Sequence, residues 1–341
     1  MMYDEIIRNN CMHNSPVEWW PKYAFHYTDV SNAVSILKEG WLYSRQDATE
    51  KKLMLNDNAS RQVIDMTSSK VTSSVRFYYR PLTPTQYHNE GYKHPKLRYC
   101  QDENANVPVP VFFLFDLQTL LCMPRTMFTE ESLAGENVKV LQGVDDFEML
   151  DFKQIYKDGP MDNPAVEKKK RQAEIIYPES FPINAALCYV VCRNEIERMT
   201  LLNLLRAESV KLFNTYHDRV VVQNSCFENN GLYITDCNYY DGRIAVTYSS
   251  TYSKKKYTNK YKVEDQDKLV ISAYAEFAWA MSRRIVERRN CKFLIDYENA
   301  ETITFTGLQK PTGANALYMR MYFENRLMCY VCWHLNESAM L

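Results

Sequence analysis

Three short segments in the first half of the chain combine residue types that could act on a charged, sugar-containing substrate. In the first, His26 ends a predicted short strand and precedes Tyr27 and Thr28. A histidine at a strand end can hydrogen-bond a sugar hydroxyl, and the backbone of an extended strand can hold a carboxamide. Taken alone, a histidine in this position is more often structural, with its hydrogen bonds satisfied inside the protein.

The second segment is rich in arginine and tyrosine. Arg61 precedes the stretch VRFYYRPLTPTQY at 75–87, which holds Arg76, Tyr78, Tyr79 and Arg80. Arginine pairs bidentately with phosphate, and tyrosine stacks on an aromatic ring such as nicotinamide or a nucleobase. A charged strand edge leading into a turn has the same composition, so this segment alone leaves both interpretations open.

The third segment is KKKRQAE at 168–174, which ends in Glu174 at the start of a predicted strand. A carboxylate at a strand end among cations can orient a ribose hydroxyl or stabilise positive charge that develops on a sugar. Most charge runs are solvated and form ordinary ion pairs. The three segments therefore gain meaning only if the fold brings them together.

The elements that must position these residues follow from periodicity. FHYTDVSNAVSILKEGWLYS predicts a strand to His26, a helix capped by Thr28 or Asp29, and a second strand after Gly40. Further strands are predicted at VRFYY, PVPVFFLFDL, EIIYP and ALCYVVC. Helices are predicted near 57–66, at 145–157 and at NEIERMTLLNLLRAE, where Asn194 caps and Glu197 lies three residues on.

After about residue 215 the chain changes to strand-like runs separated by turns. The DG pair at 241–242 predicts a hairpin, and QDKLVISAYAEFAWAMSRRIVERR predicts a helix over 266–289. Closing strands follow, the last two joined at Glu324-Asn325. We therefore predict two domains, residues 1–215 and residues 216–341.

Composition excludes several classes of protein. The 341 residues carry 41 Lys and Arg against 42 Asp and Glu, which argues against a polybasic coat for nucleic acid. The longest apolar run, 109–115, is too short to cross a membrane, and the acidic start lacks the pattern of a signal peptide. No GxGxxG or GxxxxGK[ST] phosphate loop occurs. We expect a soluble, cytoplasmic protein without membrane contact.

The cysteines do not predict a metal site. Cys329, Cys332 and His334 have the spacing of a zinc knuckle, but strand alternation would place the two cysteines on opposite faces. No second pair with ligand spacing lies nearby, so no metal is expected.

The second domain has its own basic signal. Lysines alternate with tyrosines over 252–262, a pattern that suits phosphates and unpaired bases, and we predict substrate contacts from Lys254, Lys255, Lys256 and Tyr257. Arg283, Arg284, Arg288 and Arg289 form a second basic cluster. A solvated hairpin tip, a helix C-terminus charged to suit its dipole, or a docking surface for an antitoxin would have the same composition.

Taken together, the segments resemble the DarT family of DNA ADP-ribosyltransferase toxins. The matching motifs are H-x-T-x-x-x-N-x-x-x-I-L-x-x-G from His26, F-Y-x-x-P-x-[ST]-P from Phe77, a Phe128-Thr129 step, and K/R-Q-A-E ending at Glu174. The resemblance covers roughly residues 22–215. It implies an α+β protein with an ADP-ribosyltransferase fold, a split and curved β core with flanking helices, followed here by a second α+β domain.

The resemblance also implies roles for individual residues. Glu174 would be the catalytic glutamate and Arg61 the catalytic arginine, with Arg76 in reserve. NAD would be the co-substrate, held by His26, Tyr27, Thr28, Asn32, Ser44 and Tyr78, and the acceptor would contact Arg76 and Arg80. Two positions depart from the family: Ser132 stands where F-T-x-x-H has histidine, and Leu82 stands between the prolines where arginine is common.

These features predict an NAD-dependent transferase that modifies a base in single-stranded DNA as a toxin or phage-defence effector. The departures leave RNA bases open as the acceptor, and a non-catalytic nucleic-acid-binding module is the rival from another class. A toxin of this kind implies a neutralising antitoxin, either a macrodomain hydrolase that removes the mark or a protein that binds the toxin directly.

Overall fold

The computed structural model describes residues 2–13, 17–53, 73–102, 105–134, 138–261 and 269–335. The chain divides into two compact units. Unit 1 comprises Met1–His88, Val111–Val191 and Cys226–Glu228, and unit 2 comprises Asn89–Pro110, Cys192–Ser225 and Asn229–Leu341. A single boundary near residue 215 does not describe this division, because two earlier stretches group with the C-terminal strands.

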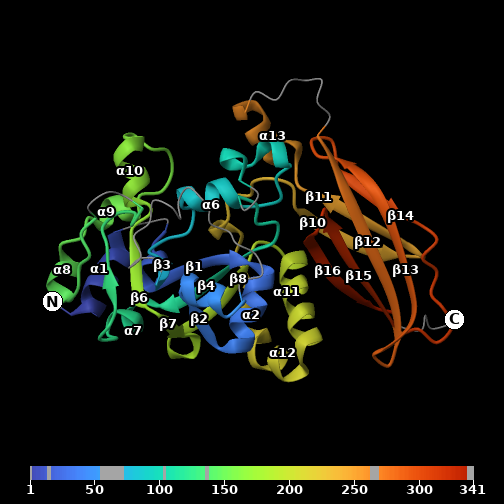
Figure 1. The fold of residues 1–341 in the computed structure, drawn as a ribbon, viewed down its shortest axis with the longest axis horizontal. Helices are drawn as coiled ribbons and strands as arrows, with labels where there is room; N and C mark the ends of the chain where they lie inside the picture. Colours follow the sequence, from blue (N-terminus) through green and yellow to red (C-terminus); the bar gives the residue numbers. More distant parts are fainter. Residues whose placement is uncertain are drawn as a thin grey trace. The chain divides into compact units, whose positions relative to one another are not determined.

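The sheet of unit 1 brings together strands that are distant in sequence. Its strands lie in the order β5-β6-β3-β1-β4-β8 (Figure 1). Their bounds are β1 Tyr23–Asp29, β3 Ser74–Tyr78, β4 Pro110–Asp116, β5 Met127–Phe128, β6 Glu174–Pro178 and β8 Leu187–Cys192. A separate pair joins β2 (Trp41–Tyr43) to β7 (Ser180–Pro182). The strands predicted in this half of the chain are confirmed.

The first helix after β1 begins and ends as predicted. In α2 (Val30–Glu39) the Asp29 carboxylate accepts from the Ser31 backbone N–H at 2.8 Å, and Gly40 closes the helix at φ 74°. The remaining helices of this unit are α1 Tyr3–His13, α3 Arg45–Glu50, α6 Pro84–Asn89, α7 Leu117–Leu121, α8 Val144–Glu148, α9 Phe152–Ile155 and α10 Pro164–Lys170. The helix predicted over 145–157 is thus two short helices, and the one near 57–66 lies outside the described residues.

Unit 2 contains two antiparallel sheets. One has the order β10-β11-β14 and the other β13-β12-β15-β16. The predicted hairpins at DG and at Glu324-Asn325 are confirmed, since Tyr240 pairs with Arg243 and Phe323 with Arg326. The elements are α11 Glu195–Glu208, α12 Val210–Tyr216, β9 Val220–Val222, β10 Ile234–Tyr240, β11 Arg243–Tyr248, α13 Thr251–Tyr261, β12 Val270–Met281, β13 Arg284–Asp296, β14 Thr302–Phe305, β15 Ala316–Phe323 and β16 Arg326–His334.

The prediction of a helix over 266–289 is wrong, because the described part of this segment lies in the hairpin of β12 and β13. Every second residue of β12 faces the core, so the pattern has the two-residue period of a strand. The buried residues that alternate are Ile271, Ala273, Ala275, Phe277 and Trp279, and Ala280, after the irregularity in pairing, is buried as well. The turn lies at Ser282 and Arg283, whose φ values are 48° and 72°.

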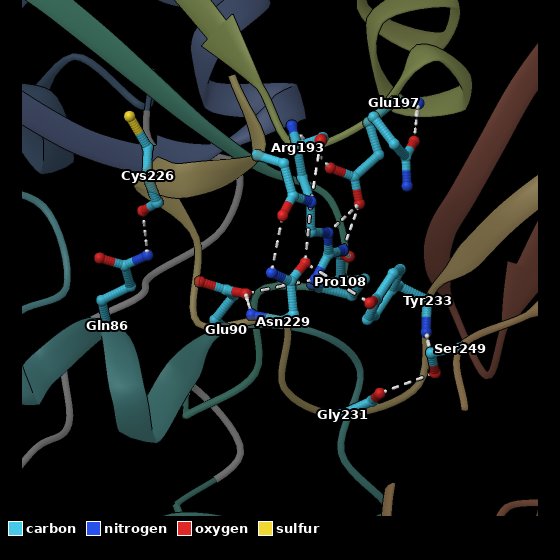
Figure 2. Close-up of polar contacts among 12 residues, drawn as sticks. Gln86, Glu90, Pro108, Arg193, Glu197, Cys226, Asn229, Gly231, Tyr233 and Ser249 are labelled. Atoms are coloured by element: carbon cyan, nitrogen blue, oxygen red, sulfur yellow. Dashed lines mark hydrogen bonds and ion pairs between the residues drawn. The ribbon is translucent and has the colours of Figure 1, made fainter. Parts of the chain in front are cut away.

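A buried ion cluster joins three stretches of unit 2 (Figure 2). The Arg193 guanidinium donates to Glu197 Oε1 at 3.1 Å and to Glu90 Oε1 at 3.3 Å, and all three side chains are at most 2% exposed. It also lies 3.6 Å from the ring centroid of Tyr233. Although burial lowers the pKa of Arg193, the two carboxylates outweigh it and raise that pKa, so the guanidinium stays charged.

In the ranges described above, no helix has both the length and the apolar character needed to cross a membrane.

Replacing Arg193 by methionine should destabilise unit 2 by about 3–5 kcal/mol, because the buried Glu90 and Glu197 would lose the cation that balances their charge. Urea unfolding followed by circular dichroism measures the change. Glu195→Gln on the same helix is the matched control: its partner Arg198 is 31% exposed, and we expect a cost below about 1 kcal/mol. Equal midpoints for the two variants would contradict the assignment.

Candidate active site

The site is built on three adjacent strands of unit 1. β3 pairs with β6 so that Tyr78 lies opposite Glu174, and β1 pairs with β3 so that Phe25 lies opposite Tyr78. This antiparallel pairing brings the three sequence segments that contain His26, Arg76 and Glu174 to one region of the sheet. The grouping expected from the sequence is therefore observed for these three residues.

A two-point ion pair joins Arg76 to Glu174. The Arg76 Nε donates to Glu174 Oε2 at 2.5 Å, and its Nη2 donates to Oε1. The glutamate side chain is 1% exposed and the arginine 27% exposed. Burial alone would lower the pKa of Arg76, but the charge of Glu174 outweighs burial and raises it. The carboxylate is thus fixed in one orientation by the planar guanidinium.

Thr129 fixes the backbone of Glu174 from the neighbouring strand. Its N–H donates to the Glu174 carbonyl at 2.8 Å, and its hydroxyl accepts from the Glu174 N–H at 3.2 Å. This residue belongs to the Phe128-Thr129 step noted in the sequence. Its role is positional, because it holds the start of β6 rather than the carboxylate itself.

His26 is anchored to the same strand as Arg76. Its Nδ1 lies 3.1 Å from the Arg76 carbonyl, and its ring has edge contacts with Phe77 and Phe113. A carbonyl only accepts, so Nδ1 carries the proton and Nε2 of the neutral ring is an acceptor. Burial lowers the pKa of His26, partly offset by that hydrogen bond, and the ring is neutral at pH 7.

Tyr78 lies beside the ion pair. Burial, and then the negative charge of Glu174, raise the pKa of its hydroxyl, while Arg76 and a hydrogen bond with Thr85 act in the opposite direction. Thr85 Oγ1 also donates to Gln172 Oε1 at 3.1 Å. Neither Thr85 nor Gln172 was predicted as a site residue, although Gln172 belongs to the K/R-Q-A-E motif and Thr85 to the segment 75–87.

The other residues predicted to bind NAD differ in burial and in the groups they contact. Thr28 is buried on β1, and Asn32 lies in the first turn of α2. The Tyr27 ring packs on Phe112, on the opposite side of β1 from His26, so only its backbone can act alongside His26. The Ser44 hydroxyl caps α3 by accepting from the Asp47 backbone N–H at 3.1 Å, and it donates to the Asp47 carboxylate at 2.8 Å.

Arg80 is not available to an acceptor, contrary to the sequence prediction. Its side chain is 1% exposed, donates to the carbonyls of Pro81 and Lys157, and lies 4.6 Å from the ring centroid of Trp20. Burial lowers the pKa of Arg80 to about 9. The guanidinium therefore holds loops of unit 1 together. Arg61, the predicted catalytic arginine, lies outside the described residues.

The basic run before β6 does not surround Glu174 as expected. Lys170 pairs with Glu130 at 2.8 Å, and Arg171 donates to the Gly159 carbonyl at 2.7 Å. Among the residues that the structure describes, the cation in contact with Glu174 is Arg76.

The lysine segment of the second domain is a helix, α13, rather than a hairpin tip. The prediction that Lys254 contacts substrate is wrong, since its buried ammonium donates to the Ala300 carbonyl. Lys255 is exposed and Lys256 half-buried. The side chain of Tyr257 is outside the description.

In the described part of the chain, no group of three or more His, Cys, Asp or Glu side chains could hold a metal ion. Cys329 lies in the core of unit 2, where burial raises the pKa of its thiol to about 12. Its neighbour Cys332 lies on the other face of β16, as strand alternation predicts.

One solved structure shares the fold of about 61% of this chain, and two others give lower scores. Thermus sp. 2.9 DarT in complex with ADP-ribosylated ssDNA is 16% identical, with a TM-score of 0.50 over 61% of this chain and 96% of that one. The same protein in complex with NAD+ gives 16% identity and a TM-score of 0.47 over 61% and 98%. Thermosipho africanus DarTG in complex with ADP-ribose gives 15% and 0.46 over 60% and 51%.

Among curated protein sequences, none matches this chain. The family model described as ssDNA thymidine ADP-ribosyltransferase, DarT, matches residues 25–222, which is more than half of the chain. The strand order, the Arg76–Glu174 pair and the His26 anchor all lie within that match. The chain therefore belongs to the DarT family of ssDNA thymidine ADP-ribosyltransferases.

Proposed function

We propose that Glu174 is the catalytic carboxylate of this chain, that Arg76 positions it, and that His26 binds the nicotinamide-side ribose of NAD+. The observation that carries this assignment is the buried two-point ion pair at the start of β6. A carboxylate held in one orientation, in a site largely closed to water, stabilises positive charge that develops on a sugar.

The reaction balances without a metal or a redox partner. The bond from the ribose anomeric carbon to nicotinamide breaks, and nicotinamide leaves as a neutral ring because its nitrogen recovers the bonding pair. The thymine ring nitrogen that carries hydrogen forms the new bond to that carbon. Its proton passes to the Glu174 carboxylate and then to water. As the acceptor of the neutral His26 ring, Nε2 would accept a hydrogen bond from a ribose hydroxyl.

Ser132 and Leu82 replace residues that commonly occur in the family. Ser132 closely follows Thr129, which bonds the Glu174 backbone, and Leu82 closely follows Tyr78. We propose that they adjust how the acceptor base is held, while the chemistry at the ribose is retained.

We further propose that the chain acts as a toxin neutralised by a partner protein. Modification of thymidine blocks base pairing, so the cell that makes the enzyme needs protection from it. The Thermosipho africanus relative is described as DarTG, a system that pairs the toxin with an antitoxin. A macrodomain hydrolase that removes ADP-ribose and a protein that binds the toxin directly would both meet this need.

Glu174→Gln should lower transfer of labelled ADP-ribose from NAD+ to a thymidine-containing single strand by at least about 100-fold, because the neutral amide neither stabilises the sugar cation nor takes up the proton. Glu179→Gln, at an exposed glutamate at the end of the same strand, is the control and should keep full activity. Pools of RNA and protein are assayed in parallel. Label in RNA alone would contradict the assigned acceptor, and an active Glu174→Gln would contradict the assigned catalyst.

The roles of Arg76 and Arg61 can be distinguished by how their replacement changes the stability of unit 1. Arg76→Met leaves Glu174 buried and unpaired, so it should cost unit 1 about 3 kcal/mol as well as activity. Arg61→Met should remove activity with no comparable loss of stability if Arg61 is the catalytic arginine. Activity assays and urea unfolding of both variants measure this. Full activity in Arg61→Met would leave Arg76 as the only arginine of the site.

His26 should make stability depend on pH. The folded-state pKa lies below the ordinary value of about 6.5, so the unfolded chain binds a proton that the folded chain rejects. Stability is therefore full above pH 6.5 and falls as the pH drops below it. His26→Gln should make the loss of unfolding free energy between pH 7.5 and 5.5 smaller than in the parent chain. An unchanged pH dependence would show that folding does not shift the pKa of His26.

A further inference from the structure

The larger sheet of unit 2 has two unlike faces. One face packs in the core with Ala275, Phe277 and Met319 among its residues. On the opposite face the alternate positions of the same strands carry half-buried tyrosines and charged side chains. The tyrosines of this face are Tyr274, Tyr318, Tyr322 and Tyr330. The outer face of this sheet therefore offers aromatic rings for contact with a ligand.

Strand register places these side chains in rows. Glu276 lies opposite Arg320, which in turn lies opposite Tyr330. The Arg320 guanidinium lies 4.2 Å from the ring centroid of Tyr330. The Tyr318 and Tyr330 ring centroids are 6.2 Å apart. Aromatic rings and a guanidinium plane therefore alternate across the middle of the sheet.

Helix α11 forms a wall at the β16 edge of this face (Figure 1). The Asn203 amide donates to the Tyr330 carbonyl at 2.9 Å, and the Tyr330 N–H donates to Thr200 Oγ1 at 3.0 Å. These bonds hold the helix against the strand so that Arg206 reaches the tyrosine face. Together the helix and the four strands line a cavity of about 440 Å³.

The charge of this cavity is strongly positive. Glu276 is the one carboxylate among its lining residues, and the arginines there are Arg206, Arg283, Arg288, Arg289 and Arg320. The Arg289 guanidinium already donates hydrogen bonds to Glu287 and to the Gly307 carbonyl. Among the described residues, no carboxylate lies within ion-pair distance of the other four guanidiniums. Unpaired cations that converge on a cavity suit a ligand with several negative charges.

We propose that this tyrosine-arginine face binds single-stranded nucleic acid, as a second site for the acceptor strand outside the ADP-ribosyltransferase site. The arginines neutralise phosphates and the tyrosines stack on bases. A duplex hides its base faces, so only unpaired strands use both features. The inference rests on the proposed function in one respect, namely that the bound strand is also the acceptor. This face is separate from the predicted lysine segment, of which Lys254 alone is contradicted as a substrate contact.

Strand binding is tested with the full chain carrying Glu174→Gln, so that no transfer occurs during the measurement. Labelled oligothymidylate of about 16 nucleotides, its oligouridylate counterpart and a duplex are titrated by fluorescence anisotropy over a range of salt concentrations. Three further changes are compared on this background: Arg288→Ala with Arg320→Ala, Tyr330→Leu, and the control pair Arg243→Ala with Arg326→Ala, two arginines of unit 2 outside the cavity.

We expect the Arg288/Arg320 pair to weaken binding of the single strand about 10–100-fold and to reduce the salt slope by about 1.4, the value for two phosphate contacts. Tyr330→Leu should weaken binding about 5–100-fold with an unchanged slope. The control pair should stay within about 2-fold. The ratio of the DNA and RNA affinities identifies which strand is preferred.

Three results would overturn the inference: affinity in the Arg288/Arg320 variant equal to that of the control, duplex bound as tightly as single strand, or a loss confined to the arginine variant with Tyr330→Leu unaffected. The last result describes a surface for any polyanion, including an acidic protein.

In the active chain the Arg288/Arg320 pair should raise KM for the strand and leave kcat unchanged. Failure of the proposed function is distinct, since it abolishes transfer while strand binding persists.

Discussion

Burial of the Glu174 carboxylate is the constraint on which the site depends. Removing a carboxylate from water costs several kcal/mol unless a cation meets it with good geometry. Here the cation comes from β3, 98 residues earlier in the chain, and forms two parallel bonds. Adjacent strands β3 and β6 are therefore a requirement of this ion pair as well as of the core.

The same strand organises the rest of the site. The backbone carbonyl of Arg76 fixes the tautomer of His26. Tyr78, two residues further along the same strand, lies beside the Glu174 carboxylate. Thr129 holds the Glu174 backbone from the other side. Strand β3 thus connects the neutral His26 ring, the Tyr78 phenol and the Glu174 carboxylate. A shift of one residue in the register of β3 would separate these three groups.

The sequence was sufficient for features that depend on local chemistry. Asp29 and Gly40 mark the ends of α2 because a carboxylate cap and a left-handed glycine leave clear signals, and His26 and Glu174 stand in motifs of recognisable order. The β12–β13 hairpin was missed because its turn uses Ser282 and Arg283 at positive φ, where glycine or asparagine is usual, and because its alanines and charged residues favour a helix. Arg80 and Lys254 are buried against carbonyls supplied by distant residues. No spacing along the chain encodes such partners.

Unit 2 draws its ion cluster from three stretches of the polypeptide, with Glu90 in the first and Arg193 in the second. The third supplies Asn229, whose N–H donates to Glu90 at 2.8 Å across a separation of 139 residues. During synthesis on the ribosome, Glu90 emerges long before either partner and must remain hydrated until they follow. The region beyond the family match therefore shares one compact unit with residues 89–110 and 192–225. A single cut near residue 222 would remove the Asn229 donor from Glu90 and the Tyr233 ring from Arg193.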